Sequence, residues 1–308
     1  MSVSSVRPRW ATIPPMCPMP FQRALIVVNP IAGRGRARKA AAALRDGLSG
    51  LPMAVEVFET SARGDASRRV GELEPEVDLV VSVGGDGTLA EILETLPSEI
   101  PVAVLPLGTA NVLGTEVHLP RDATGLVQVI ARGNSTGLNT ARVNGGISFL
   151  VTGVGFDGAI VENVEARRRG PITKLFYVRS VLRTFLRFRP TKLTVSIDGE
   201  EKPGPWAWVL VSNVRGYGGV VKLNTGNKLD DGLFEVILFP RADTLSLLGY
   251  AMRALVGRLP GGSCKMVRAS SVQIEADRPT PVQIDGEFAG HTPVEFEVRP
   301  QCHRLLIP

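Results

Sequence analysis

The sequence predicts two domains, the first with a parallel α/β sheet and the second built mostly of β-strands. Up to about residue 134, short apolar runs alternate with glycine-rich loops and helix-like runs, which is typical of parallel βα units. Beyond that point, strand-like runs follow one another, and several are joined by Asp-Gly or Asn-Gly pairs, a strong hairpin signal. The 308 residues are enough for about two domains with separate cores.

We expect a disordered leader over residues 1–20, a first domain over 21–136 and a second over 137–308. The leader is rich in proline and lacks the continuous apolar segment of a signal peptide. No apolar run reaches the roughly 18 residues that a membrane-spanning helix needs. The three cysteines are scattered and show no metal-ligand spacing, which indicates a reducing, cytoplasmic environment.

The most informative stretch is Gly84-Gly85-Asp86-Gly87-Thr88, which stands between an apolar run over 78–83 and a helix-like run over 89–96. A strand that ends in glycines and turns into a helix favours phosphate binding, because the backbone can approach a polyanion closely and the helix start presents N–H groups. The carboxylate of Asp86 would repel phosphates unless a cation lay between them, so it indicates Mg²⁺. The alternative is an ordinary glycine-rich turn.

The other elements of the first domain follow the same pattern. Apolar strands are expected over 23–28, 54–58 and 101–105, and helices over 36–48, 65–73 and 123–132. Because parallel strands end at one edge of a sheet, the loops that follow them should meet there and hold the ligand. A third glycine for a Rossmann fingerprint and the GxxxxGK[ST] motif of a P-loop are both missing.

Three of these loops carry candidate nucleotide contacts. Gly33 and Gly35 could line phosphates, or they could simply start a helix with solvated arginines. Thr109 and Asn111 could hydrogen-bond a nucleotide or cap the helix that begins there. Thr60 stands at the end of the second strand, where the same edge of the sheet is expected.

In the second domain, strands are expected over 140–143, 148–154, 193–197, 206–211, 234–239, 271–275, 282–284 and 294–298. Helices are expected near 160–165, over 172–188 and near 244–256. The net charge is +5, and the positive charge is concentrated in one segment. The segment from Arg167 to Arg189 holds eight basic residues and no acidic one.

The helix over 172–188 is amphipathic. Arg179, Arg183 and Arg187 form one stripe along it. Another face carries Leu175, Val178, Leu182 and Phe185. Such a helix can lie on an anionic membrane, or it can pack on the β domain with a solvated basic face.

Three acidic positions of the second domain stand beside glycines. Asp157 could join a Mg²⁺ network or cap a helix, and Asp231 could bind a cation or make a turn. Asp285 and Glu287 lie in an Asp-Gly-Glu turn that could supply a general base. The same Ile-Asp-Gly-Glu sequence also occurs over 197–200, and spacing alone does not separate the two.

Together these motifs resemble the diacylglycerol kinase catalytic-domain superfamily, which includes bacterial lipid kinases and sphingosine kinases. The matching segments, in the family's order, are Asn29-Pro30-x-x-Gly33, Gly84-Gly85-Asp86-Gly87-Thr88, Leu107-Gly108-Thr109-Ala110-Asn111, Gly153-x-Gly155-Phe156-Asp157, Asp230-Asp231-Gly232-Leu233 and Asp285-Gly286-Glu287. The resemblance implies an α/β nucleotide-binding domain, a β-sandwich domain and an active site in the cleft between them.

The resemblance also implies the reaction and its cofactors, ATP and Mg²⁺. The γ-phosphoryl group of ATP would be transferred to a hydroxyl group of a lipid such as diacylglycerol or a sphingoid base. The implied ATP contacts are Asn29, Pro30, Gly33, Thr60, Gly84, Gly85, Asp86, Gly87, Thr88, Leu89, Ala90, Thr109 and Asn111. Asp86 and Asp157 would join the catalytic Mg²⁺ network, and Asp231 with the carbonyls of Lys228 and Leu233 would hold a structural Mg²⁺.

The second Asp-Gly-Glu would supply the proton acceptor, and we slightly favour Glu287 over Asp285. Two departures from the family pattern stand out. Many relatives carry Asp where this chain has Val112, and the usual run of three glycines reads Gly216-Tyr217-Gly218-Gly219-Val220. The first departure removes a carboxylate from the Mg²⁺ network, and the second can reshape the lipid site.

The implied partners are a lipid substrate at a membrane surface and, through Arg179, Arg183 and Arg187, an anionic membrane. The protein would then be cytoplasmic and peripherally membrane-associated. We expect no nucleic-acid partner, and a homodimer stays open. A soluble kinase of the NAD-kinase or phosphofructokinase type also fits Gly-Gly-Asp-Gly. Val112 keeps open a member that binds nucleotide or lipid without transferring phosphate.

Overall fold

The computed structural model describes residues 20–167, 174–217, 221–223, 225–299 and 303–308. The predicted leader, apart from Pro20, therefore lies outside the described residues. The chain forms two compact units. The first unit comprises the residues up to Thr109, Val117–Thr136 and Arg304–Pro308, and the second comprises Ala110–Glu116 and Gly137–His303.

These units differ from the predicted domains in two segments. Ala110–Glu116 belongs to the second unit and Arg304–Pro308 to the first. The physical reason is long-range pairing. Arg215 forms an ion pair with Glu116, whereas Leu305 pairs with Val102 in the first sheet.

The elements of the first half of the chain, in order, are β1 (Arg23–Val28), α1 (Ala32–Gly35), α2 (Ala37–Leu48), β2 (Ala54–Glu59), α3 (Asp65–Gly71), β3 (Leu79–Gly84), α4 (Asp86–Thr95), β4 (Val102–Pro106), α5 (Val112–Glu116), α6 (Ala123–Arg132) and β5 (Ser135–Leu138). The elements that follow are β6 (Ala141–Val143), β7 (Gly146–Ser148), β8 (Val151–Val154), α7 (Phe156–Arg167), α8 (Lys174–Arg187), β9 (Leu193–Ile197), β10 (Glu200–Glu201), β11 (Trp208–Ser212), β12 (Gly216–Tyr217), β13 (Val221–Lys222), β14 (Phe234–Phe239), α9 (Thr244–Leu255), β15 (Lys265–Ala269), β16 (Ser271–Ala276), β17 (Pro281–Ile284), β18 (Glu287–His291), β19 (Val294–Val298) and β20 (His303–Leu306).

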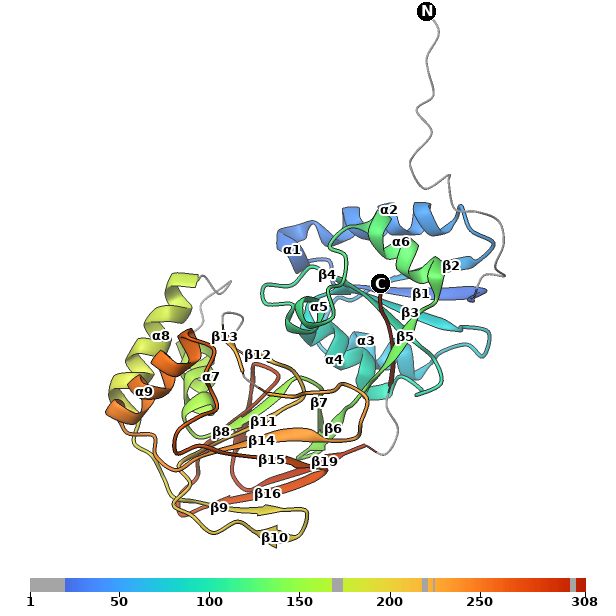
Figure 1. The fold of residues 1–308 in the computed structure, drawn as a ribbon. Helices are drawn as coiled ribbons and strands as arrows, with labels where there is room; N and C mark the ends of the chain where they lie inside the picture. Colours follow the sequence, from blue (N-terminus) through green and yellow to red (C-terminus); the bar gives the residue numbers. More distant parts are fainter. Residues whose placement is uncertain (1–19, 168–173, 218–220, 224, 300–302) are drawn as a thin grey trace, which may run out of the picture. The chain divides into compact units, whose positions relative to one another are not determined.

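The first unit is a mixed, mostly parallel sheet in the order β2-β1-β3-β4-β20-β5, with helices on both faces (Figure 1). Ile26, Val28 and Val81 pack with the buried side of α2, while Leu25 and Val27 on the opposite face are also fully buried. Burial on both faces explains why β1 and β3 read as continuous apolar runs rather than alternating ones. The predicted α/β class is confirmed.

Strand β20 is the main element of this sheet that the sequence does not predict. Its side chains Leu305 and Leu306 are fully buried, and Leu305 pairs in parallel with Val102 of β4. A run of four residues is too short to give a periodic signal, so only the pairing partner reveals it.

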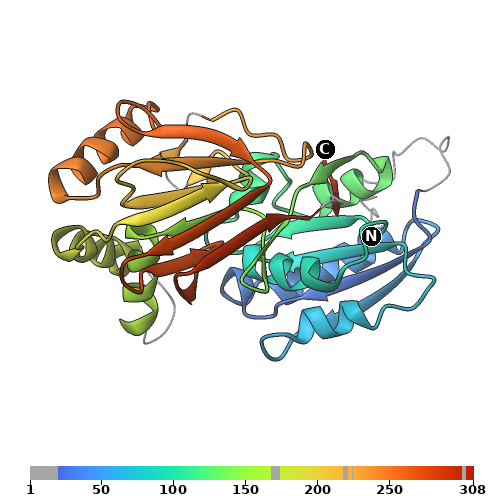
Figure 2. The same ribbon diagram turned by 90° about the horizontal axis from the view of Figure 1, so that it is seen from below.

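The second unit is a sandwich of two antiparallel sheets. One has the order β10-β9-β16-β19-β6-β7 and the other β15-β14-β11-β8-β17-β18. Val195 and Phe296 from the first sheet and Val209 and Phe234 from the second share one core, and Phe234 meets Phe296 edge to face. The predicted all-β character of this part is confirmed. The helices α7, α8 and α9 gather at one end of the sandwich (Figures 1 and 2).

The predicted strand over 148–154 is interrupted, and this is a correction. It forms two strands, β7 and β8, because the backbone N–H groups of Phe149, Leu150 and Val151 turn toward the carboxylate of Asp285. A side-chain acceptor thus replaces ladder pairing over these residues.

Both Ile-Asp-Gly-Glu sequences form hairpin turns, as predicted. Asp198 and Gly199 have φ of 49° and 81°, and Asp285 and Gly286 have φ of 50° and 89°. Both central residues of a type I′ turn need positive φ, which explains the Asp-Gly pair. Among the described residues, no helix combines the length and apolar character needed to cross a bilayer.

Candidate active site

The first unit brings together the glycine-rich loops that follow β1, β3 and β4. A Cβ on Gly85 would lie 3.1 Å from the Cα of Gly108, so the loops after β3 and β4 touch through their backbones. Gly33, with φ of 60°, lies against Leu107 in the same way. The expected meeting of these loops at one edge of the sheet is therefore present.

Side chains reinforce this meeting. The amide Nδ2 of Asn29 donates to the hydroxyl of Thr88 at 3.3 Å, and the N–H of Asn29 donates to the carbonyl of Val83 at 3.0 Å. A Cβ on Gly84 would stand 2.5 Å from the same Thr88 hydroxyl, so the residue before the turn has to be glycine. The arrangement leaves a tight backbone surface rather than a lining of bulky side chains.

Helix α4 begins at Asp86, three residues before the predicted helix start. Asp86 therefore lies in the first turn, where a carboxylate is favoured by the positive end of the helix dipole. Leu89 is buried in the core, so its side chain does not face solvent. Thr60 has its hydroxyl against the carbonyl of Val28 at 3.3 Å, which holds it at the end of β1.

In the second unit, Asp285 is surrounded by hydrogen-bond donors. Its Oδ1 accepts from the hydroxyl of Ser148 at 3.0 Å and from the N–H groups of Leu150 and Val151 at 2.9 Å. Its Oδ2 accepts from the N–H of Phe149 at 2.9 Å. Burial raises the pKa of Asp285 to about 6, against the opposite effect of these hydrogen bonds.

A second buried carboxylate is tied to the same turn. Asp157 accepts from the phenol of Tyr217 at 2.6 Å and from the amide of Gln283 at 2.5 Å. The carbonyl of Gln283 in turn accepts from the N–H of Gly286 at 2.7 Å. Burial raises the pKa of Asp157 to about 6. A Cβ on Gly153 would collide with this carboxylate, which accounts for the glycine of the motif.

The three oxygen donors predicted to hold a structural cation do converge. The carbonyl oxygens of Lys228 and Leu233 and the Oδ1 of Asp231 each lie 3.4 Å from the amide nitrogen of Asn139. Asp231 also forms an ion pair with Arg268. The sequence analysis missed Asn139, which is 92 residues from Asp231 along the chain.

A buried carboxylate stands near this oxygen cluster. Glu235 is 1% exposed and lies 3.6 Å from the guanidinium of Arg268, and neither of its oxygens has a hydrogen-bond partner among the described residues. Burial raises its pKa, and the nearby Asp231 adds to the effect. Hard oxygen donors with a spare buried carboxylate fit the preferences of Mg²⁺. No described group of three or more His, Cys, Asp or Glu residues forms a metal cluster.

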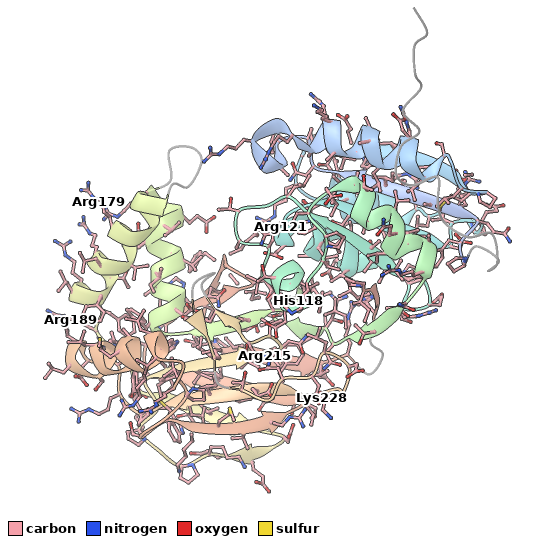
Figure 3. The ribbon with its side chains drawn as sticks, turned by 45° about the horizontal axis from the view of Figure 1, so that its top comes forward. His118, Arg121, Arg179, Arg189, Arg215 and Lys228 are labelled. Carbon is pink, nitrogen blue, oxygen red and sulfur yellow. The ribbon has the colours of Figure 1, made fainter. Side chains whose placement is uncertain are left out.

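Val112 is the first residue of helix α5, which belongs to the second unit. A Cβ on Gly216 would lie 3.2 Å from Cγ1 of Val112, so α5 packs closely on β12. Arg215, labelled in Figure 3, joins Glu116 of the same helix at 2.9 Å, and the N–H of Gly216 donates to Glu116 at 3.2 Å. Residues 218–220 of the glycine run lie outside the described residues.

Comparison with known protein families covers both units. Residues 23–143 match the diacylglycerol kinase catalytic domain, and residues 150–307 match the YegS C-terminal NAD kinase beta sandwich-like domain. The chain belongs to the diacylglycerol kinase family. This confirms the resemblance stated from the motifs, and the family is one of kinases.

Several diacylglycerol kinases are similar over most of their length. The one from Bacillus subtilis (strain 168) is 26% identical over 282 residues, covering 90% of this chain and 93% of that protein. The one from Staphylococcus aureus (strain MRSA252) is 26% identical over 288 residues, covering 89% of each.

Two solved structures share the fold. A diacylglycerol kinase from Bacillus anthracis str. Sterne superposes with a TM-score of 0.77 at 24% identity, covering 94% of this chain and 99% of that one. An NAD kinase from Archaeoglobus fulgidus in complex with ATP gives a TM-score of 0.50 at 16% identity, covering 92% and 93%.

The residues that sequence analysis missed differ in whether the sequence carries a signal for them. Gln283 left a signal, because it is a polar residue inside the apolar strand β17. Ser148 and Asn139 left none, since each acquires its role only through partners far away in the chain.

Proposed function

We propose that this member of the diacylglycerol kinase family transfers the γ-phosphoryl group of ATP to a hydroxyl group of a lipid, such as diacylglycerol or a sphingoid base. The observation that carries the proposal is the Asp285-Gly286-Glu287 turn, because it is the one of the two identical turns whose aspartate is anchored through both carboxylate oxygens and which Gln283 links to Asp157. Phosphoryl transfer to an alcohol needs a positioned proton acceptor, and this anchoring supplies the positioning.

The first unit would bind ATP through the loops after β1, β3 and β4. Their glycines expose backbone N–H groups, and the start of α4 adds a favourable dipole for phosphate. Asn29 and Thr88 hold two of these loops together, so they are positioning residues for the nucleotide. Gly33, Gly84 and Gly85 let the chain approach the phosphates closely.

Two sites would hold Mg²⁺. Asp86 would carry the ion that accompanies ATP, and Asp231 with the carbonyls of Lys228 and Leu233 would carry a structural ion, with Glu235 close by. When bound, Mg²⁺ neutralises charge on the transferred phosphoryl group. Both carboxylate oxygens of Asp157 accept hydrogen bonds from neutral donors. Asp157 would therefore contact the catalytic Mg²⁺ only through a bridging water molecule.

We assign the proton acceptor to Glu287 rather than Asp285. The two oxygens of Asp285 already accept four hydrogen bonds, which leaves them poorly placed to take a proton from a substrate. Glu287 is exposed and begins β18 directly after the anchored turn. Asp285 then serves as a positioning residue.

The acceptor lipid would be reached at a membrane surface through α8. Arg179, Arg183 and Arg187 are exposed along this helix, and Figure 3 labels Arg179 near its start. A row of cations on an amphipathic helix attracts anionic headgroups.

The test is a phosphorylation assay with ATP and Mg²⁺ against a panel of lipids in mixed micelles. We expect one lipid to be phosphorylated by the wild type, and Asp86→Asn and Glu287→Gln to lose about two orders of magnitude or more in turnover. Glu200→Gln is the matched control, because Glu200 occupies the same position in the other Ile-Asp-Gly-Glu turn. It should retain the wild-type rate.

The outcomes separate the alternatives. Loss of less than tenfold in Glu287→Gln contradicts the assignment of the proton acceptor. Phosphorylation of NAD but of no lipid indicates a soluble kinase of the NAD-kinase type. ATP binding without a product on any acceptor indicates a non-catalytic member.

A further inference from the structure

Helix α9 has an apolar face that points away from the protein. The exposed fractions are 80% for Leu245, 51% for Leu248, 55% for Met252, 72% for Leu255 and 62% for Val256. The first four are spaced by three or four residues, which places them on one side of the helix, and Val256 follows directly at its C-terminal end. Leu247 and Tyr250, on the opposite side, are buried and hold the helix to the sandwich. The packing of α9 on the sandwich therefore does not explain why the outer side of the helix is apolar.

Helix α8 lies beside α9 and also exposes apolar side chains (Figures 1 and 2). Leu182 is 57% exposed and Leu186 is 67% exposed. On the helix surface both stand next to the arginine stripe, since Leu182 comes three residues after Arg179 and Leu186 three residues after Arg183. Leu182 is thus not part of a buried face of α8, whereas Thr184 and Ser180 are buried.

The surroundings of this surface are strongly basic. A cavity of about 320 Å³ beside α8 is lined by Arg183, Arg187, Arg189 and Arg278, and no carboxylate is among its lining residues. Within the described part of the chain, none of these four arginines forms an ion pair with an acidic side chain. The guanidinium of Arg183 is close enough to Arg167 and Arg187 for repulsion to lower its pKa. Figure 3 labels Arg179 within α8 and Arg189 just beyond its C-terminal end.

We propose that the outer faces of α8 and α9 form a bilayer-docking surface, in which the apolar side chains of α9 enter the acyl region of an anionic membrane. In this arrangement Leu182 and Leu186 lie at the interface, and the arginines of α8 bind lipid phosphates. Apolar side chains rimmed by cations match a bilayer whose headgroups are anionic. The inference deepens the proposed function by adding α9 as an inserting element, and it rests on that function only for the identity of the membrane-borne substrate.

Charge argues against a second copy of the chain as the occupant. A twofold interface is formed by the same patch on both subunits, so the arginine cluster of one copy would lie near that of the other. Like charges without intervening carboxylates oppose such a contact. An anionic bilayer relieves the same repulsion.

The first experiment measures co-sedimentation of the full chain with vesicles, in the absence of ATP. Vesicles of phosphatidylcholine with phosphatidylglycerol are compared with vesicles of phosphatidylcholine alone. We expect the variant Leu245→Gln/Leu255→Gln to lose at least about tenfold in partitioning to the anionic vesicles, because both side chains would leave water on binding. Met266→Gln is the matched control, since Met266 is 46% exposed on β15 of the same unit, and its partitioning should change less than about twofold.

The two vesicle compositions separate apolar insertion from charge. High salt should weaken the binding of the wild type to anionic vesicles and leave its weak binding to neutral vesicles unchanged. The leucine variant should lose binding to both. Equal partitioning of the double variant and the wild type overturns the proposal, provided that their thermal unfolding midpoints agree.

The second experiment locates the inserted residues. In a Trp10→Phe background, whose remaining Trp206 and Trp208 are buried, tryptophan introduced as Leu248→Trp should be quenched by brominated lipids, whereas Met266→Trp should not. No quenching of Leu248→Trp in vesicle-bound protein overturns the insertion of α9. A dimer seen by sedimentation velocity that Leu245→Gln/Leu255→Gln dissociates, with vesicle binding unchanged, assigns the surface to a second copy and also overturns it.

These readings do not depend on phosphoryl transfer. If the α9 substitutions reduce vesicle binding but no lipid is phosphorylated, the docking surface is supported and the proposed reaction is contradicted. If a lipid is phosphorylated in micelles but the α9 substitutions do not change vesicle binding, the reaction is supported and the docking surface is contradicted.

Discussion

At the scale of single residues, the two Ile-Asp-Gly-Glu turns show how one local sequence gives two different sites. Asp198 and Asp285 have nearly the same φ and both accept hydrogen bonds from backbone N–H groups. Asp198 receives its bonds from Ser270 and Ser271 through Oδ1 alone. Asp285 uses both oxygens and is partly buried, whereas Asp198 is exposed. The difference comes from what lies opposite each turn.

The two aspartates should therefore respond differently to the same substitution. Asp285→Asn places an amide N–H₂ against one of its N–H donors, and we expect the free energy of unfolding to fall by at least about 2 kcal/mol. Asp198→Asn keeps the single accepting oxygen and should cost less than about 1 kcal/mol. Urea unfolding at neutral pH measures both. Equal losses in the two variants would contradict the role assigned to Asp285.

Asp157 gives a prediction about pH. Its pKa is raised by burial from 3.8 to about 6, so the folded state binds the proton more tightly than the unfolded state. The contribution of Asp157 to stability is then complete below about pH 4 and is lost as the pH rises through about 6. Relative to Asp157→Asn, the wild type should lose up to about 3 kcal/mol between pH 4 and pH 7. Urea unfolding in EDTA checks this, and a constant difference would exclude the raised pKa.

Candidate site residues could be selected from the sequence only where their motif is local. Short motifs with recognisable glycines and turn residues contain Asp86, Asp231 and Glu287. Gln283 lies in β17 and Asn139 lies between β5 and β6, so the partners of both side chains are set by sheet register. No local pattern reports that register, so the structure was needed to find them.

At the scale of elements, most strands and helices follow from periodicity, and the exceptions have physical causes. The strands Arg23–Val28 and Phe234–Phe239 have the predicted bounds. The run over 148–154 breaks because a carboxylate captures its N–H groups. The apolar pattern of α9 predicts a helix but points its leucines outward, since periodicity does not say which partner covers a face.

Two helical glycines offer a test of element packing. A Cβ on Gly158 of α7 would collide with the carbonyl of Pro281, which begins β17, so Gly158→Ala should destabilise the protein by about 1 to 3 kcal/mol. In α9 a Cβ on Gly249 would meet only the end of Arg253 at 3.6 Å. Gly249→Ala should stabilise the protein by about 0.5 to 1 kcal/mol.

Thermal unfolding of both glycine variants measures the contrast. The two substitutions should shift the midpoint in opposite directions. A stabilised Gly158→Ala would show that α7 can move away from β17 at little cost.

At the scale of the whole molecule, the two fold classes could be predicted, whereas the path of the chain between the units could not. A change of pattern near residue 134 marks the start of the sandwich strands. The transfer of 110–116 and 304–308 to the other unit depends on contacts such as that between Arg215 and Glu116, which leave no compositional trace.

Removing residues 304–308 tests how much β20 contributes to the stability of the first unit. The deletion takes away Leu305 and Leu306, both fully buried, and leaves β4 without a neighbour on that side. We expect a loss of about 4 kcal/mol or more in the free energy of unfolding of that unit. Arg304→Ala, which alters an exposed side chain of the same strand, should have little effect. Calorimetry and ATP binding measure the outcome, and an unaffected first unit would contradict the importance of β20.

The place of β20 in the first sheet also bears on synthesis by the ribosome. The segments of the sandwich unit all emerge before Leu305 and Leu306, although the strands β1 to β4 emerge earlier still. The first unit therefore starts to form first and is completed only when β20 emerges, after the last strand of the sandwich. Until β20 pairs, the edge of β4 remains open to pairing with other chains, so the nascent protein is most exposed to aggregation between the emergence of β4 and that of β20.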